Sequence, residues 1–184
     1  QLALQTAWRG RVDFEHLHQL VPWPEVPIPT VQASVAAPVR SREGLQIIKT
    51  HLGAGELPVT DEGRYVVVLR DPKDMLVSAY HFARGVLQAM IDGDFTPAQW
   101  LAAFLSGRFF MGSWAQHAAG WWALREAPNV LVLTFRELKA DLPGQADRLA
   151  AFLGVSLDEA ERQAVLARSS FRWMKAHESR FAPV

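Results

Sequence analysis

The segment YVVVLRDPKDMLVSAYHF, residues 65–82, carries the clearest structural signal in the chain. Its four apolar residues before Arg70 predict a buried strand. A helix is predicted directly afterwards, because Asp71 is a good N-cap and Pro72 suits the first helical position. Ser78 adds a hydroxyl two turns into that helix. The strand therefore delivers a guanidinium, whose planar fork suits phosphate, to a helix N-terminus, which is a ready anion site.

The composition fits one globular α/β domain covering residues 1–184. The chain is 49% hydrophobic and 21% charged, which is enough for a sizeable core. Its net charge of zero gives no overall field toward nucleic acid or an anionic membrane. The chain has no cysteine and no apolar run long enough to span a bilayer, so a reducing cytoplasm is the expected location. The six histidines are scattered without zinc-site spacing, so no metal is expected.

Strands and helices alternate along the chain, which predicts a parallel sheet with helices on both faces. The predicted strands are residues 46–50, 64–69 and 130–134, and the predicted helices are residues 1–9, 73–86, 96–105, 114–125, 143–153 and 157–168. Recurring prolines between residues 22 and 38 predict a loop. Such sheets bind ligands at the carboxyl ends of their strands, and His51, Arg70 and Phe135 follow three predicted strands.

Five motifs, in order and at similar spacing, resemble those of the cytosolic-type sulfotransferases. These enzymes use 3′-phosphoadenosine 5′-phosphosulfate, PAPS. The segment around Arg70 and Ser78 resembles the family's 3′-phosphate-binding motif. The other four motifs are IKTHL at residues 48–52, GSW at 112–114 with WW at 121–122, NVLVLTF at 129–135, and SSFRWMK at 169–175. The resemblance implies a fold like that of P-loop nucleotide hydrolases and the transfer of a sulfuryl group from PAPS, leaving 3′-phosphoadenosine 5′-phosphate, PAP.

The resemblance implies that Lys49 and His51 are catalytic. The two residues are two apart in a predicted extended segment, so their side chains share a face. His51 matches the family's general base, and its ordinary pKa lies near working pH. Lys49 can neutralise charge on the sulfonate or the leaving group. Taken alone, such a histidine is more simply a structural residue bonded to a backbone carbonyl.

The nucleotide needs an anion site and a flat apolar slot. Arg70 and Ser78 fit the 3′-phosphate. Phe171 and Met174, three apart on a predicted helical turn, fit the adenine ring, although both residue types also fill ordinary cores. By resemblance, Ser169 and Ser170 contact the nucleotide as well.

The acceptor side carries fewer signals. Trp23 and Phe82 match aromatic residues that line the family's acceptor pocket, and plain core packing accounts for them equally well. Phe135 stands where the family usually has a tyrosine, so the ring is kept and a hydrogen bond to the nucleotide is lost. The acceptor is expected to be a hydroxyl, less readily an amine, of a small molecule, lipid or glycan. A monomer and a homodimer are both compatible with the sequence.

Two alternatives remain at this point. A P-loop nucleotide kinase shares the architecture, but its Walker lysine and acidic magnesium ligands are not found in these residues. A non-catalytic remnant that binds nucleotide is the other. The family's PKSGTTW-like phosphate loop and its RKGxxGDW segment are not in the sequence. The chain is therefore expected to be the middle of a longer enzyme and to be inactive by itself.

Overall fold

The computed structural model describes residues 1–26, 37–87, 95–107 and 112–181. The chain packs into two compact units. Unit 1 comprises residues 1–50 and 141–184, and unit 2 comprises residues 51–140. No helix among the described residues is long and apolar enough to cross a membrane.

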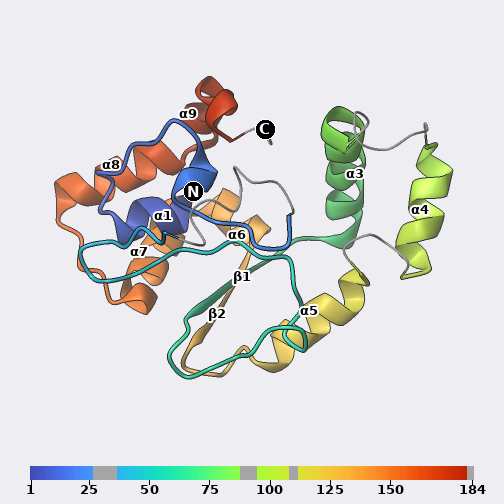
Figure 1. Cartoon of the computed structure of the whole chain (residues 1–184), viewed down its shortest axis with the longest axis horizontal. Coiled ribbons are helices and arrows are strands. Elements are labelled where there is room, and N and C mark those ends of the chain that lie inside the picture. Colours follow the sequence, from blue (N-terminus) through green and yellow to red (C-terminus); the bar gives the residue numbers. More distant parts are fainter. Residues whose placement is uncertain (27–36, 88–94, 108–111, 182–184) are drawn as a thin grey trace. The chain divides into compact units, whose positions relative to one another are not determined.

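Unit 2 is built on two parallel strands, β1 (Tyr65–Leu69) and β2 (Val130–Thr134). Side chains alternate across the sheet, and one face packs against Trp121 of helix α5 (Trp114–Ala123). The core on this face contains Val67, Val130 and Trp121, all buried. Figure 1 shows the two strands side by side. The predicted α/β class with a parallel sheet and flanking helices is thus confirmed.

The rest of unit 2 is helical. Helix α3 (Pro72–Phe82) follows β1 and continues into a π-helical turn, Ala83–Leu87. Helix α4 (Pro97–Leu105) packs on α3 through Trp100, whose indole N–H donates to the carbonyl of Leu76 at 3.1 Å. A short helix, α6 (Phe135–Ala140), begins directly after β2.

Unit 1 contains helices from both ends of the sequence. Helix α1 (Leu2–Ala7) packs on α7 (Leu142–Leu153) and α8 (Glu159–Ser169), as Figure 1 shows. The remaining elements are α9 (Phe171–Ala176) and two 3₁₀ turns, Leu17–Gln19 and Glu178–Arg180. The core of this unit groups Leu4, Val12, Phe14 and Val21 with half-buried residues around them.

An ion network ties the end of α1 to the start of α8. Arg9 adopts a left-handed backbone conformation, with φ of 57°, and pairs with Glu43 at 2.7 Å and Glu161 at 3.0 Å. Glu161 is buried and also caps the start of α8. The network joins three segments that lie far apart in the sequence.

Two predicted elements differ from the structure. Residues 46–50 form no strand within the described residues, because the Lys49 N–H donates to the carbonyl of Pro22 at 2.9 Å instead of to a neighbouring strand. The described sheet has two strands rather than three. The predicted helix 73–86 changes to the π-helical form after Phe82.

Candidate functional site

The carboxyl ends of β1 and β2 bring Arg70 and Phe135 together. In the parallel register Leu69 lies opposite Thr134, so the next residue of each strand emerges at the same edge. The Arg70 guanidinium carbon lies 4.5 Å from the centroid of the Phe135 ring, a cation–π contact. The Nε atom of Arg70 is buried and has no hydrogen-bond partner among the described residues. A buried donor of this kind favours an acceptor from a ligand.

The start of α3 adds the second half of this edge. The carboxylate of Asp71 accepts from the N–H groups of Lys73 at 2.8 Å and Asp74 at 3.4 Å, so the predicted N-cap is confirmed. Pro72 occupies the first turn as expected. Ser78 is exposed, with its hydroxyl open to a ligand. Arg70 and Ser78 therefore belong to one strand–helix junction in unit 2.

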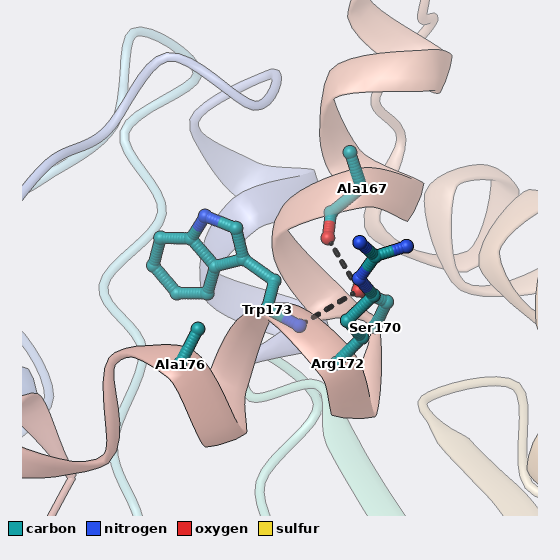
Figure 2. A pocket seen from close by; sticks show the side chains of 5 residues that line it. All are labelled: Ala167, Ser170, Arg172, Trp173 and Ala176. Carbon is teal, nitrogen blue, oxygen red and sulfur yellow. Dashed lines mark hydrogen bonds between the residues drawn. The ribbon is translucent and has the colours of Figure 1, made fainter.

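The junction of α8 and α9 in unit 1 holds the predicted adenine-side residues. Ser169 is buried, and its hydroxyl has no partner among the described residues. Ser170 is the N-cap of α9: its hydroxyl donates to the Ala167 carbonyl at 2.7 Å and accepts from the Trp173 N–H at 3.2 Å (Figure 2). Phe171 is 78% exposed, which leaves a flat ring available for stacking. Met174 is half-buried on the same helix.

Trp173 has a structural role that the sequence did not reveal. Its ring stacks on His177, with centroids 4.1 Å apart, and meets Phe181 edge-on at 6.1 Å. It also lines an open pocket of about 310 Å³ together with Arg172 and the small residues Ala167 and Ala176 (Figure 2). Trp173 therefore anchors α9 to the chain that follows it.

Lys49 lies against the predicted acceptor residue Trp23. Its Nζ is 3.5 Å from the centroid of the Trp23 ring. Trp23 in turn stacks on His18, with centroids 6.0 Å apart. Burial lowers the pKa of Lys49, and the carboxylate of Glu25 opposes that effect. The charged form of this lysine is therefore costly, and the ring face partly compensates for the lost water.

His51 and Phe82 lie in unit 2. His51 is half-buried and precedes Leu52, whose carbonyl accepts the Trp121 indole N–H at 3.3 Å, so α5 fixes the backbone next to the candidate base. Phe82 is the last residue of α3 and is 44% exposed. Each predicted site residue thus has a defined place within its own unit.

Two features of the site had no place in the sequence interpretation. The first is α6, which follows Thr134 directly. Thr134 and Glu137 form a capping box, in which the Glu137 N–H donates to Thr134 Oγ1 at 3.1 Å. The Thr-x-x-Glu spacing was a readable signal. The second feature is the contact of Lys49 with Trp23, which no local spacing indicates, because the two residues are far apart in the chain.

The described residues thus combine a parallel α/β sheet with an arginine at a strand end beside a capped helix. The chain matches the Sulfotransferase domain family over residues 4–182 and belongs to that family. This membership decides against the nucleotide-kinase alternative.

Three comparisons illustrate the relationship. Human Sulfotransferase 1C2 is 29% identical over 169 residues, covering 90% of this chain and 55% of that protein. Luciferin sulfotransferase of Photinus pyralis is 37% identical over 145 residues, covering 74% of this chain and 37% of that protein. The crystal structure of retinol dehydratase in complex with androsterone and the inactive cofactor PAP superposes with a TM-score of 0.69 at 29% identity, covering 82% of this chain and 44% of that chain. The chain thus spans about half, or less, of the length of these relatives.

Proposed function

We propose that the full-length protein containing this chain transfers a sulfuryl group from PAPS to a hydroxyl of a small-molecule or glycolipid acceptor. The observation that carries the proposal is the Arg70 junction: a guanidinium at a strand end, with a buried Nε that lacks a protein partner among the described residues, beside a capped helix. Family membership and the PAP complex of the retinol dehydratase relative support the choice of nucleotide.

In this proposal the nucleotide carries a 3′-phosphate, and each unit contributes its own contacts to it. Arg70 offers a charge-assisted donor and Ser78 a hydroxyl for that phosphate. On the adenine side, Phe171 presents an exposed ring and Met174 a thioether, while Ser169 has a buried hydroxyl without a partner in the described chain. Bound PAPS would supply the sulfuryl group.

His51 acts as the general base in this proposal. It takes the proton from the acceptor hydroxyl, which makes the oxygen nucleophilic, and such a base contributes roughly 10²–10⁴-fold to the rate. Lys49 supplies the positive charge that the sulfonate and the leaving phosphate require. Burial of the lysine strengthens that interaction, because a less polar surrounding screens charge less than water does.

A small apolar alcohol or phenol suits the acceptor side best. Phe82 is an exposed aromatic at the end of α3, and aromatic surface favours a hydrophobic acceptor. The androsterone of the retinol dehydratase complex and the luciferin in the name of the firefly relative are acceptors or ligands of this size. Amines are the less favoured alternative.

The test is a transfer assay on the full-length protein with ³⁵S-labelled PAPS and a panel containing a phenol, a sterol and a glycolipid. We expect label to move to at least one of these hydroxyls. The matched controls are His51→Ala, which should abolish most transfer, and His81→Ala on exposed α3, which should not. If the folded protein binds PAP but labels no acceptor, it is a nucleotide-binding remnant and the proposal is wrong.

A further inference from the structure

The Trp23 side chain is tied to a candidate catalytic group rather than standing open to a substrate. The Lys49 ammonium lies 3.5 Å from the centroid of its ring, close enough for a strong cation–π contact. No ion pair to Lys49 is found among the described residues, so the ring is a principal neighbour of this charge. One face of Trp23 is therefore occupied.

The backbone explains why the two residues meet. Trp23 lies between Pro22 and Pro24, and prolines restrict the chain on both sides of it. The Lys49 N–H donates to the Pro22 carbonyl at 2.9 Å, which joins the two segments one residue before Trp23. The side chains of Lys49 and Trp23 are thus held together by a bond that does not depend on either side chain.

Other groups nearby support the same arrangement. The His18 ring stacks on Trp23, and its Nδ1 lies 2.8 Å from the Val21 carbonyl, which fixes the imidazole beside the indole. The charged and titratable side chains that act on Lys49 or are acted on by it are Glu25 and His18. Glu25 also accepts a hydrogen bond from the Thr50 hydroxyl, so its carboxylate is held next to this segment.

We propose that Trp23 is a positioning residue, which holds the Lys49 ammonium in place and in its charged form through the face of the indole ring. This inference rests on the proposed function, because it assigns Trp23 to the sulfuryl side of the reaction instead of to the acceptor pocket. The ring does not touch the reacting atoms in this account. It acts through the lysine.

Substitutions at Trp23 separate the ring face from simple burial. Trp23→Phe keeps an aromatic face, although a weaker one for a cation. Trp23→Leu keeps apolar bulk and removes the face. Trp8→Leu is the packing control, since Trp8 packs against the core of the same unit and no cation lies over its ring among the described residues.

The first experiment does not depend on activity. Lysine side chains of the full-length protein are labelled with ¹³C, and the Lys49 signal is assigned by Lys49→Arg. We expect the ε-methylene protons of Lys49 to be shifted upfield by the indole ring current in the wild type and in Trp8→Leu, but not in Trp23→Leu. The pKa of Lys49 should be lower in Trp23→Leu than in the wild type, and its value in Trp23→Phe should lie between the two. If the chemical shift of the Lys49 ε-methylene protons and the pKa of Lys49 are the same in Trp23→Leu as in the wild type, the proposal is wrong.

The second experiment measures steady-state rates with saturating PAPS. A cation–π contact of the usual size predicts that Trp23→Leu lowers kcat roughly 2- to 30-fold, with partial rescue in Trp23→Phe and little change in the acceptor KM. A raised acceptor KM at unchanged kcat would show that Trp23 lines the acceptor pocket, contrary to the proposal. Absence of transfer in the wild type contradicts the proposed function, and the NMR result still decides the role of Trp23.

Discussion

Arg70 and Lys49 are two candidate site residues that each lie over an aromatic ring, and they reach that ring by different routes. Arg70 meets Phe135 at 4.5 Å because two parallel strands end side by side. Lys49 meets Trp23 at 3.5 Å because hydrogen bonds, among them the one from the Lys49 N–H to the Pro22 carbonyl, join two segments without regular structure. In the proposed function the strand-end pair binds the nucleotide and the loop-tied pair takes part in the chemistry.

The difference between the two pairs shows how the register of a sheet determines which residues meet. Once two strands are known to be parallel neighbours, the residues just beyond their ends are placed together without further information. A contact between loops has no such rule. The division predicts that substitutions on the two sides change different measured quantities.

The largest effect is expected on the chemistry side. His51→Ala in the full-length protein should lower turnover at least about 10²-fold, since the proposed general base is lost, and leave PAP affinity nearly unchanged. Single-turnover rates and calorimetry measure the two quantities separately. A variant that keeps its rate and loses nucleotide affinity would place His51 on the binding side.

A somewhat smaller effect is expected at the strand end. Arg70→Ala removes a charge-assisted hydrogen bond of roughly 1.5–3 kcal/mol, so PAP affinity should fall about 10- to 100-fold. Arg64→Ala, at the other end of β1, is the matched control and should bind PAP normally.

The specificity of that loss is checked with adenosine 5′-phosphosulfate, which has no 3′-phosphate. The wild type should bind it weakly, and Arg70→Ala should bind it equally weakly. If Arg70→Ala weakens both nucleotides to the same extent, Arg70 serves the fold or the 5′ side.

Position 135, where the family usually has a tyrosine, tests the strand-end pair of Arg70 and Phe135 further. Phe135→Tyr keeps the ring under Arg70 and adds a hydroxyl, and one neutral hydrogen bond of roughly 0.5–1.5 kcal/mol predicts a 2- to 10-fold gain in PAP affinity. Phe135→Leu removes the ring and should reduce affinity. Equal affinity in Phe135→Tyr and the wild type would show that the hydroxyl does not reach the nucleotide.

The smallest effect concerns the helix that follows β2. Thr134→Ala removes the cap of α6 and should cost roughly 0.5–2 kcal/mol of the free energy of unfolding. Thr134→Ser keeps the hydroxyl and should be close to wild type. Urea denaturation measures both variants. Identical midpoints for Thr134→Ala and the wild type would show that the Thr134 cap does not contribute to the free energy of unfolding.

Local signals predicted much of the fold. Thr96 and Pro97 fixed the start of α4, and Gly154, with φ of 70°, ends α7 in the left-handed conformation that favours glycine. Asp71 and Pro72 marked the start of α3 correctly. Each of these residues acts through bonds within a few positions, so the sequence alone was sufficient.

Signals that depend on distant partners were less reliable. Residues 46–50 have strand-like composition, but a strand needs a neighbour, and here the Lys49 N–H bonds to Pro22. The predicted end of α3 was also wrong, because no local sequence signal indicates the π-helical turn. The roles of the site residues, including His51 and Ser169, stay predictions. The Trp23–Lys49 contact arises from a bond between distant loops and could not be predicted.

The most direct measurement is the calorimetric titration of the full-length wild-type protein with PAP and, separately, with adenosine 5′-monophosphate. We expect saturable binding of PAP at one site and much weaker binding of adenosine 5′-monophosphate, which lacks the 3′-phosphate that we propose Arg70 binds. Equal affinity for the two nucleotides, or no binding of PAP by a protein whose folding is verified by thermal unfolding, would contradict this proposal.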